Sequence, residues 1–228
     1  MSALPEPATI REIDTDMLRA DPIRWIGASQ PWVVRSLVND WPLVRATQAS
    51  DANFLDYLLE FYSGNQVCVF LGEPDIGGRF FYNEALDGFN FIQLQTSLNQ
   101  LSAQLRSLAT EKSPASLYMG STNLDHWLPG LRENNALPIE LDSPLVSLWL
   151  GNQSLIAPHF DFPSNIACCV AGTRRFLLFP PDQVANLYVG PWDLTPAGQA
   201  ISLVDTRKPD LEKHPDFRHA MTQAFSAE

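Results

Sequence analysis

The sequence predicts a mainly β fold, a sandwich or jelly roll, preceded by a region of mixed α/β character. From residue 143 onward, short apolar runs alternate with turn-forming Gly and Pro residues. The chain also carries 18 prolines against 12 glycines, which favours many loops and strand ends over long helices. Its 228 residues can form one structural unit, in which an α/β extension at 1–113 packs on a β core at 114–228.

The N-terminal region is expected to contain short elements of both kinds. These are a loose tail at 1–9, a short strand leading into a loop at 31–44, a helix at 52–62, a strand at 66–71 and a turn at Gly77-Gly78. One face of the helix should be buried, because apolar side chains recur there at helical spacing: Phe54, Tyr57, Leu58 and Phe61.

A second helix is predicted at 91–109. Its apolar residues alternate in steps of three and four: Phe91, Leu94, Leu98, Leu101, Leu105 and Leu108. Such a seam could join two chains as a coiled coil, but it is too short for a sustained heptad repeat. Packing on the protein's own sheet is therefore the favoured use, and a homodimer is the alternative.

Four short strands are expected in the core, at 143–152, 155–162, 165–171 and 174–181, with a tight turn at Gly172-Thr173 between the last two. Residues 187–205 have the composition of a loop. A proline in a first-turn position then opens a helix that is predicted to run from 214 to the last residue.

The charge of the chain excludes one class of partner. The 15 Lys and Arg residues against 26 Asp and Glu residues give a net charge of −11, whereas nucleic-acid binding needs clustered basic residues. The N-terminus lacks an export signal, and no apolar run is long enough to span a membrane. We therefore expect a cytoplasmic protein. The cysteines form no CxxC pair, and the adjacent Cys168 and Cys169 are expected to be small core residues.

His159 and Asp161 are candidates for a metal site. In a strand, residues i and i+2 project from the same face, so the imidazole and the carboxylate would point together. These two groups can supply two of the three ligands of a facial triad, with a second histidine from elsewhere and open positions left for substrate and oxygen. The spacing alone is common, and the alternative is two polar residues that alternate with aromatic ones.

Arg174 strengthens the metal hypothesis. It stands beside Arg175 at the head of an otherwise apolar strand, downstream of His159. An arginine that points into a barrel needs a partner, and a carboxylate matches the geometry of its guanidinium group best. A carboxylic acid cosubstrate would meet that need. The alternative is a surface ion pair with one of the many Asp and Glu residues.

Together these residues closely resemble the cupin-like JmjC-domain family, which contains the asparaginyl hydroxylase that acts on hypoxia-inducible factor. The resemblance rests on the HxD motif at 159–161, followed by Asn165 and by "GTRRFLLFPP" at 172–181, and on "QPWVVRSLVNDWPLV", "GRFFYNEALDGFNF" and "LYMGSTNLDHWLPG" upstream. It covers nearly the whole chain. The resemblance implies a double-stranded β-helix (a cupin-like jelly roll) and a hydroxylase, an Fe(II)- and 2-oxoglutarate-dependent dioxygenase.

The resemblance also implies roles for five residues. His159 and Asp161 match two of the iron ligands. Arg174 matches the basic residue, usually lysine, that pairs with the distal carboxylate of 2-oxoglutarate. Asn165 matches a polar contact to the same cosubstrate, and Tyr118 corresponds to a tyrosine that makes another.

The chain departs from the family pattern in two places. Ile156 stands where some relatives carry a threonine that touches 2-oxoglutarate. The second histidine of the family lies in a Trp-Trp-His-like strand, which would be expected just after the last residue of this chain. His214 and His219 are interpreted as surface residues, and His126 is not favoured as a replacement for the missing histidine ligand. The resemblance therefore implies a fragment or a degenerate copy that lacks its C-terminal strands. We expect such a chain to bind iron weakly and to have little or no catalytic turnover.

Two other functions stay open. The missing histidine and the leucine seam favour a non-catalytic cupin-like scaffold or a dimerising interaction module. A cupin that uses zinc or manganese for isomerase-type chemistry would need a glutamate ligand and extra histidines, and neither is evident. The substrate, whether a protein side chain or a small molecule, has no signature in the sequence.

Overall fold

A computed structural model describes residues 3–228, and the chain divides into two compact units. Unit 1 contains the residues up to Arg35 together with 84–88 and 157–228. Unit 2 contains 36–83 and 89–156. Each unit is therefore assembled from segments that are distant in the sequence. The boundary expected at residue 113 falls within unit 2.

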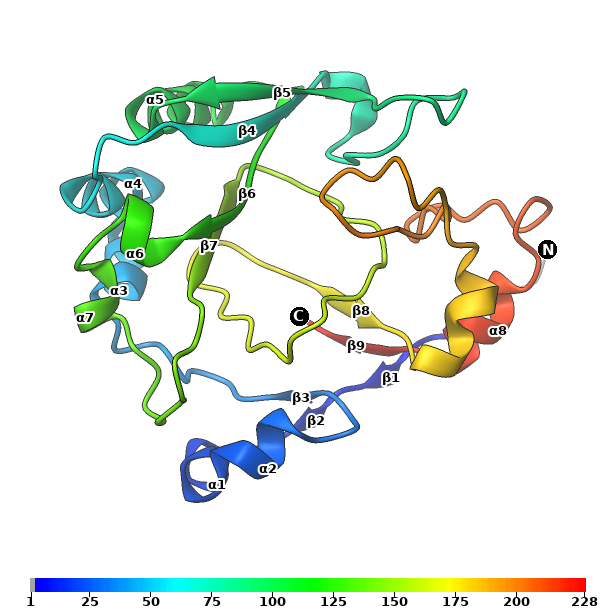
Figure 1. The fold of residues 1–228 in the computed structure, drawn as a ribbon, viewed down its shortest axis with the longest axis horizontal. Helices are drawn as coiled ribbons and strands as arrows, with labels where there is room; N and C mark the ends of the chain where they lie inside the picture. Colours follow the sequence, from blue (N-terminus) through cyan, green and yellow to red (C-terminus); the bar gives the residue numbers. More distant parts are fainter. Residues whose placement is uncertain (1–2) are drawn as a thin grey trace. The chain divides into compact units, whose positions relative to one another are not determined.

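Unit 2 is built on a four-stranded antiparallel sheet. Its strands are β4 (Val67–Gly72), β5 (Phe91–Thr96), β6 (Ser116–Asn123) and β7 (Ser147–Gly151), in the order β5-β4-β6-β7. Figure 1 shows β4 and β5 running side by side. The strands predicted at 66–71 and 143–152 are thus confirmed as β4 and β7.

The helices of unit 2 are short. They are α3 (Pro42–Ala49), α4 (Asp51–Glu60), η1 (Pro74–Ile76), α5 (Leu98–Leu108), α6 (Leu124–Trp127) and α7 (Leu131–Asn134). The prediction of a helix at 52–62 is confirmed by α4, which buries Phe54 and Leu58 on one face. Helix α3 was not predicted, and it begins at a proline, which suits the first turn of a helix.

The predicted helix at 91–109 is wrong in its first third. Residues 91–96 form β5, which pairs with β4 along its whole length. The helix begins only at Leu98, because Ser97 accepts from the backbone of Gln100 while the Gln100 side chain returns to the backbone of Ser97. Three leucines of the seam are buried in unit 2, with exposures of 7% or less: Leu98, Leu101 and Leu105. The helix therefore packs on its own sheet, as the favoured alternative predicted.

A buried amide joins α3 to α7. Asn135 is 5% exposed, and its Oδ1 accepts from the backbone N–H of Leu43, in the first turn of α3, at 3.0 Å. Its Nδ2 donates to the carbonyl of Leu131 at 2.8 Å and to the hydroxyl of Tyr57 at 3.3 Å. The amide therefore satisfies a helix-end donor that would otherwise be buried without a partner.

Unit 1 contains two small sheets. The first has the order β1-β9-β8 and the second pairs β2 with β3. The strands are β1 (Ala8–Thr9), β2 (Arg11–Glu12), β3 (Trp32–Val33), β8 (Phe176–Leu178) and β9 (Phe225–Ala227). The helices are α1 (Thr15–Ala20), α2 (Pro22–Ile26), η2 (Pro181–Leu187) and α8 (Phe217–Thr222). Strand β3 lies in the segment predicted to begin with a strand, and β8 lies in the strand predicted at 174–181.

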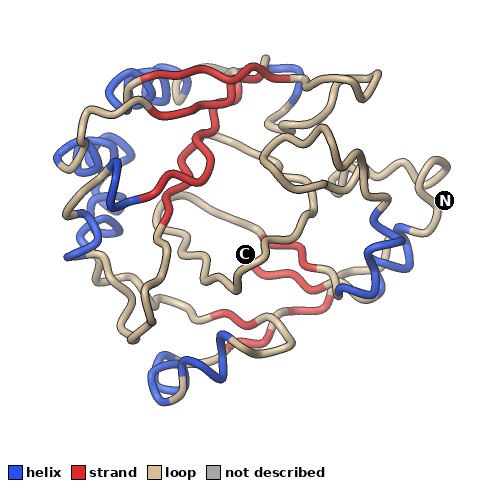
Figure 2. Tube along the Cα trace, in the orientation of Figure 1, coloured by secondary structure: helices blue, strands red, loops and turns tan. Residues whose placement is uncertain are grey.

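The strands predicted at 155–162 and 165–171 are wrong. Figure 2 draws the chain between β7 and β8 as loop, and within residues 3–228 only an isolated bridge at Leu155 falls in these segments. A strand needs a neighbouring backbone to complete its hydrogen bonds. The described part of the chain supplies no ladder partner for these segments, so their apolar sequences do not form strands.

The C-terminal helix is shorter than predicted. Helix α8 ends at Thr222, and 225–227 form β9, which pairs with both β1 and β8. The helix contributes Phe217, Ala220 and Met221 to a buried apolar cluster, which Val204 and Ala224 complete. Pairing on both sides satisfies the backbone of β9, which a frayed last turn of helix would leave to solvent. No helix in residues 3–228 is long and apolar enough to cross a lipid bilayer.

Candidate metal site

His159 and Asp161 converge in a loop of unit 1. The Nδ1 atom of His159 is 2.8 Å from the carbonyl oxygen of Ala157. A carbonyl can only accept, so Nδ1 carries the proton and donates, which leaves the lone pair of Nε2 available. Nε2 lies 3.8 Å from Oδ1 of Asp161, and the two side chains are 25% and 48% exposed. The loop therefore brings together the two residues that were expected on a strand.

Two carboxamides hold the carboxylate of Asp161. Asn165 Nδ2 donates to Oδ2 at 3.5 Å, which is the limit for a hydrogen bond. Gln199 Nε2 donates to Oδ1 at 3.2 Å. Gln199 was not predicted, because it belongs to 187–205, where the sequence indicates only a loop. No local spacing relates it to the HxD motif.

Arg174 lies at the surface of unit 1 and not inside a barrel. Its guanidinium carbon is 5.2 Å from the ring centroid of Phe176, within the range of a cation–π contact. Within residues 3–228 it forms no ion pair with a carboxylate. Its neighbour Arg175 is also exposed and donates from Nε to Ser226 Oγ at 3.1 Å. Arg174 is therefore exposed and makes no ion pair among the described residues, whereas Arg175 uses one of its guanidinium donors within the unit.

Tyr118 belongs to the core of unit 2. It is 9% exposed, and its ring centroid lies 6.1 Å from that of Phe70 and 5.7 Å from that of Phe80. Ile156 packs against the same aromatic cluster. The position of Tyr118 is thus fixed by apolar packing, and its contact with a cosubstrate stays a prediction.

The other histidines do not complete a metal site with His159. His126, at the end of α6 in unit 2, is exposed and its Nε2 lies 3.4 Å from Asn65 Nδ2. His219 is exposed on α8, as predicted. The prediction that His214 lies at the surface is wrong: it is 6% exposed and packs against the ring of Tyr188. Among residues 3–228, no three His, Cys, Asp or Glu side chains are grouped so that they could hold a metal ion.

The adjacent cysteines differ in environment. Cys168 is half-buried, whereas Cys169 is exposed, so the prediction that both belong to the core is wrong for Cys169. Burial, together with the neighbouring Cys169, raises the pKa of the Cys168 thiol to about 11. Cys168 therefore stays protonated at neutral pH and is a poor metal ligand or nucleophile, since both roles need the thiolate.

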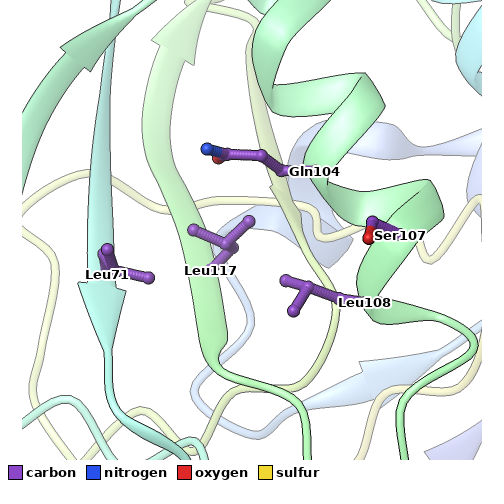
Figure 3. A pocket seen from close by; sticks show the side chains of 5 residues that line it. All are labelled: Leu71, Gln104, Ser107, Leu108 and Leu117. Atoms are coloured by element: carbon purple, nitrogen blue, oxygen red, sulfur yellow. The ribbon is translucent and has the colours of Figure 1, made fainter.

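Unit 2 contains a small cavity between α5 and its sheet (Figure 3). Its volume is about 180 Å³, and it is lined by Leu71, Gln104, Ser107, Leu108 and Leu117. The lining contains one amide and one hydroxyl group, but no ionisable side chain. This cavity therefore does not compete with the HxD loop as the candidate site.

Comparison with known proteins identifies the family. The model of the cupin-like domain family matches residues 23–228. JmjC domain-containing protein D of Dictyostelium discoideum is 23% identical over 206 residues, which cover 83% of this chain and 43% of that protein. Jumonji C domain-containing protein 5 of Drosophila melanogaster is 24% identical over 188 residues, which cover 78% and 43%. Lysine-specific demethylase JMJ31 of Arabidopsis thaliana is 24% identical over 134 residues, which cover 54% and 24%.

The chain thus spans less than half the length of each of these relatives. The match to the family and the antiparallel sheet of unit 2 fit a jelly-roll-type fold. Because the family model covers most of the sequence, the chain belongs to the cupin-like domain family, and the relatives named above are JmjC-domain proteins.

Proposed function

We propose that this chain carries the metal-binding and cosubstrate-binding residues of an Fe(II)- and 2-oxoglutarate-dependent oxygenase that hydroxylates a C–H bond. The observation that supports this most is the 3.8 Å approach of His159 Nε2 to Asp161 Oδ1. Bonds from a metal to nitrogen and oxygen ligands are each about 2 Å long, so two neighbouring ligand atoms of a facial triad lie about 3 Å apart, and the two side chains would close by about 1 Å when they bind one cation. An imidazole with a carboxylate is the donor set that suits non-haem Fe(II).

Each residue of the loop has a defined part in this proposal. The carbonyl of Ala157 fixes the tautomer and the ring orientation of His159, so that Nε2 faces the metal position. Arg174 would bind the distal carboxylate of 2-oxoglutarate through its planar guanidinium group. Asn165 would contact the same molecule. When bound, Fe(II) and 2-oxoglutarate supply the activation of oxygen, with decarboxylation of the keto acid to succinate.

The described residues supply only two of the three ligands of a facial triad. We expect this chain by itself to bind iron weakly and to turn over slowly, because each missing ligand lowers the affinity for the metal. In the proposed enzyme a second histidine would come from polypeptide outside the described residues, together with strands that pair with the unpaired segments between β7 and β8.

The substrate in this proposal is a protein side chain or a small molecule. The net charge of −11 supports a partner other than a nucleic acid. The name of the Arabidopsis relative, a lysine-specific demethylase, supports a protein side chain as the first substrate class to test.

Calorimetric titration with Fe(II) under anaerobic conditions, or with Mn(II), in the presence of 2-oxoglutarate tests the metal site. The intact chain should release heat of binding, and His159→Ala should lose it. His219→Ala is the matched control, because this histidine is exposed in the same unit and away from the loop. Identical curves without binding for the intact chain and for His159→Ala would refute the metal site.

The neighbouring arginines provide a test of the cosubstrate site. Arg174→Gln should abolish the effect of 2-oxoglutarate on metal binding, whereas Arg175→Gln should keep it, because the family resemblance assigns the carboxylate contact to Arg174 and not to Arg175, whose Nε donates to Ser226. Equal behaviour of the two variants would contradict the role of Arg174.

A non-catalytic scaffold is the alternative, and the limit of two ligands among the described residues favours it. A scaffold should form a stable dimer without affinity for metal. Size-exclusion chromatography with light scattering, beside the titration, distinguishes the two functions. Three leucines of α5, Leu98, Leu101 and Leu105, are buried in unit 2, so a dimer would have to use a surface other than these three side chains.

A further inference from the structure

We propose that Gln199 is a positioning residue, which holds the carboxylate of Asp161 in the orientation that binds the metal. The proposal rests on the function proposed above. Gln199 belongs to a segment, residues 199–202, that runs beside the HxD loop in unit 1 and is anchored to it at two points.

Two hydrogen bonds join the 199–202 segment to the loop. The backbone N–H of Ser202 donates to the carbonyl of Pro158 at 2.8 Å. The side chain of Gln199 donates to Asp161 Oδ1 at 3.2 Å. Within residues 3–228 the two segments form no ladder, so these are two separate contacts, one from the backbone and one from a side chain. The backbone bond of Ser202 places the segment that carries Gln199 beside the loop, and the amide of Gln199 then reaches the carboxylate.

The 199–202 segment is itself fixed from its other side. The backbone N–H of Gly190 donates to the carbonyl of Ile201 at 2.9 Å. Ser202 is 1% exposed, and its hydroxyl donates to the carbonyl of Leu187 and accepts from the N–H of Val204. Ile201 is 6% exposed. The backbone that carries Gln199 is thus held by buried hydrogen bonds, and its amide approaches Asp161 from a rigid support.

The chemistry of this contact suits a metal ligand. The oxygen that accepts from Gln199 is Oδ1, the same atom that faces His159 Nε2. A carboxylate oxygen has two lone pairs, so one can accept the amide N–H while the other remains for a cation. A neutral amide orients the carboxylate without neutralising its charge. A lysine or arginine in the same place would compete with the metal cation for that charge.

Asn165 does not provide the same support. It approaches the other oxygen, Oδ2, at 3.5 Å and is exposed to solvent. Gln199 is half-buried and closer. Loss of a hydrogen-bonding partner behind a metal ligand lowers metal affinity about 10-fold to 100-fold in other metal sites. We expect an effect in that range from Gln199 and a smaller one from Asn165.

Titration of the metal-free chain with Co(II), followed by the visible absorption of the bound ion, tests this role. Gln199→Met has similar length but no N–H donor, and Gln199→Asn keeps the amide but falls short by one carbon–carbon bond. Both should raise the Kd for Co(II) about 10-fold to 100-fold and alter the absorption band, because the carboxylate turns. Gln223→Met is the matched control on the exposed end of α8 and should behave like the intact chain.

Thermal melting of the metal-free variants separates positioning from folding. All three variants should melt within a few degrees of the intact chain, so a lost Co(II) band would reflect the site. If the band disappears in Asp161→Ala but stays unchanged in both Gln199 variants, the role of Gln199 is refuted and the metal site stands. If the intact chain produces no band, both this inference and the proposed metal site are refuted.

Discussion

Replacement of Ser202 by alanine tests whether the segment beside the metal loop is held as rigidly as its hydrogen bonds indicate. The Ser202 side chain lies in a site closed to water, at 1% exposure. Its hydroxyl serves two backbone groups at once, the carbonyl of Leu187 and the N–H of Val204. Alanine fits the same space but leaves both groups without this partner.

The cost follows from those two groups. A buried backbone group that loses its partner costs about 1 to 3 kcal/mol, so two such groups cost about 2 to 6 kcal/mol. Because the small void allows some relaxation, we expect about 3 kcal/mol. In a chain of this size each kcal/mol lowers the melting temperature by about 2 to 4 °C, so the variant should melt about 6 to 12 °C lower.

Urea denaturation followed by circular dichroism measures this loss, with Ser164→Ala as the control, since Ser164 is exposed in the same unit. A free energy of unfolding for Ser202→Ala within about 0.5 kcal/mol of the control would show that the hydroxyl does not fix the segment. The backbone bond from Ser202 to Pro158 survives in alanine. Affinity for Co(II) should therefore fall less than in Gln199→Met.

Three further predictions concern stability and reactivity. Asn135→Ala removes the amide that serves two buried backbone groups of α3 and α7, and should cost about 2 to 4 kcal/mol in urea denaturation. Asn134→Ala, an exposed neighbour on α7, should change stability by less than about 0.5 kcal/mol, and equal effects would contradict the role of the amide. At pH 8, a thiol reagent should modify the exposed Cys169 well before Cys168, whose raised pKa keeps it protonated. Since burial raises this pKa above the value in the unfolded chain, the protonated thiol adds stability that is complete at neutral pH and is lost as the pH rises toward about 11. A constant stability between pH 8 and 11 would contradict this.

The helices were predictable where one face and one capping residue agree. Helix α4 has both, with an apolar face and Ser50 accepting from the N–H of Asn53. The start of α5 was missed because Phe91 and Leu94 continue the apolar spacing of the helix into β5. The capping box at Ser97 and Gln100 is visible in the sequence and would have placed the start at Leu98. Apolar spacing alone does not mark where a helix begins.

The strands of the core were less predictable, since pairing is not a local property. Segments 155–162 and 165–171 are short apolar runs bounded by turn-forming residues, yet no backbone in residues 3–228 lies beside them in a ladder. At the C-terminus the opposite occurred. Residues 225–227 were expected to extend a helix, but they pair with two neighbouring strands, β1 and β8. In both cases the outcome depended on a partner that is distant in the sequence.

The candidate site combines one local and one distant relationship, and only the first is visible in the sequence. His159 Nε2 and Asp161 Oδ1 lie 3.8 Å apart across a spacing of two residues, so their relationship is local. The structure brings the two side chains together in a loop, although the predicted strand did not form. Gln199 reaches Asp161 from a segment that the Ser202 N–H joins to the carbonyl of Pro158, about forty residues away in the sequence. A motif can thus indicate which atoms bind a metal, whereas the residues that orient those atoms depend on how distant segments pair.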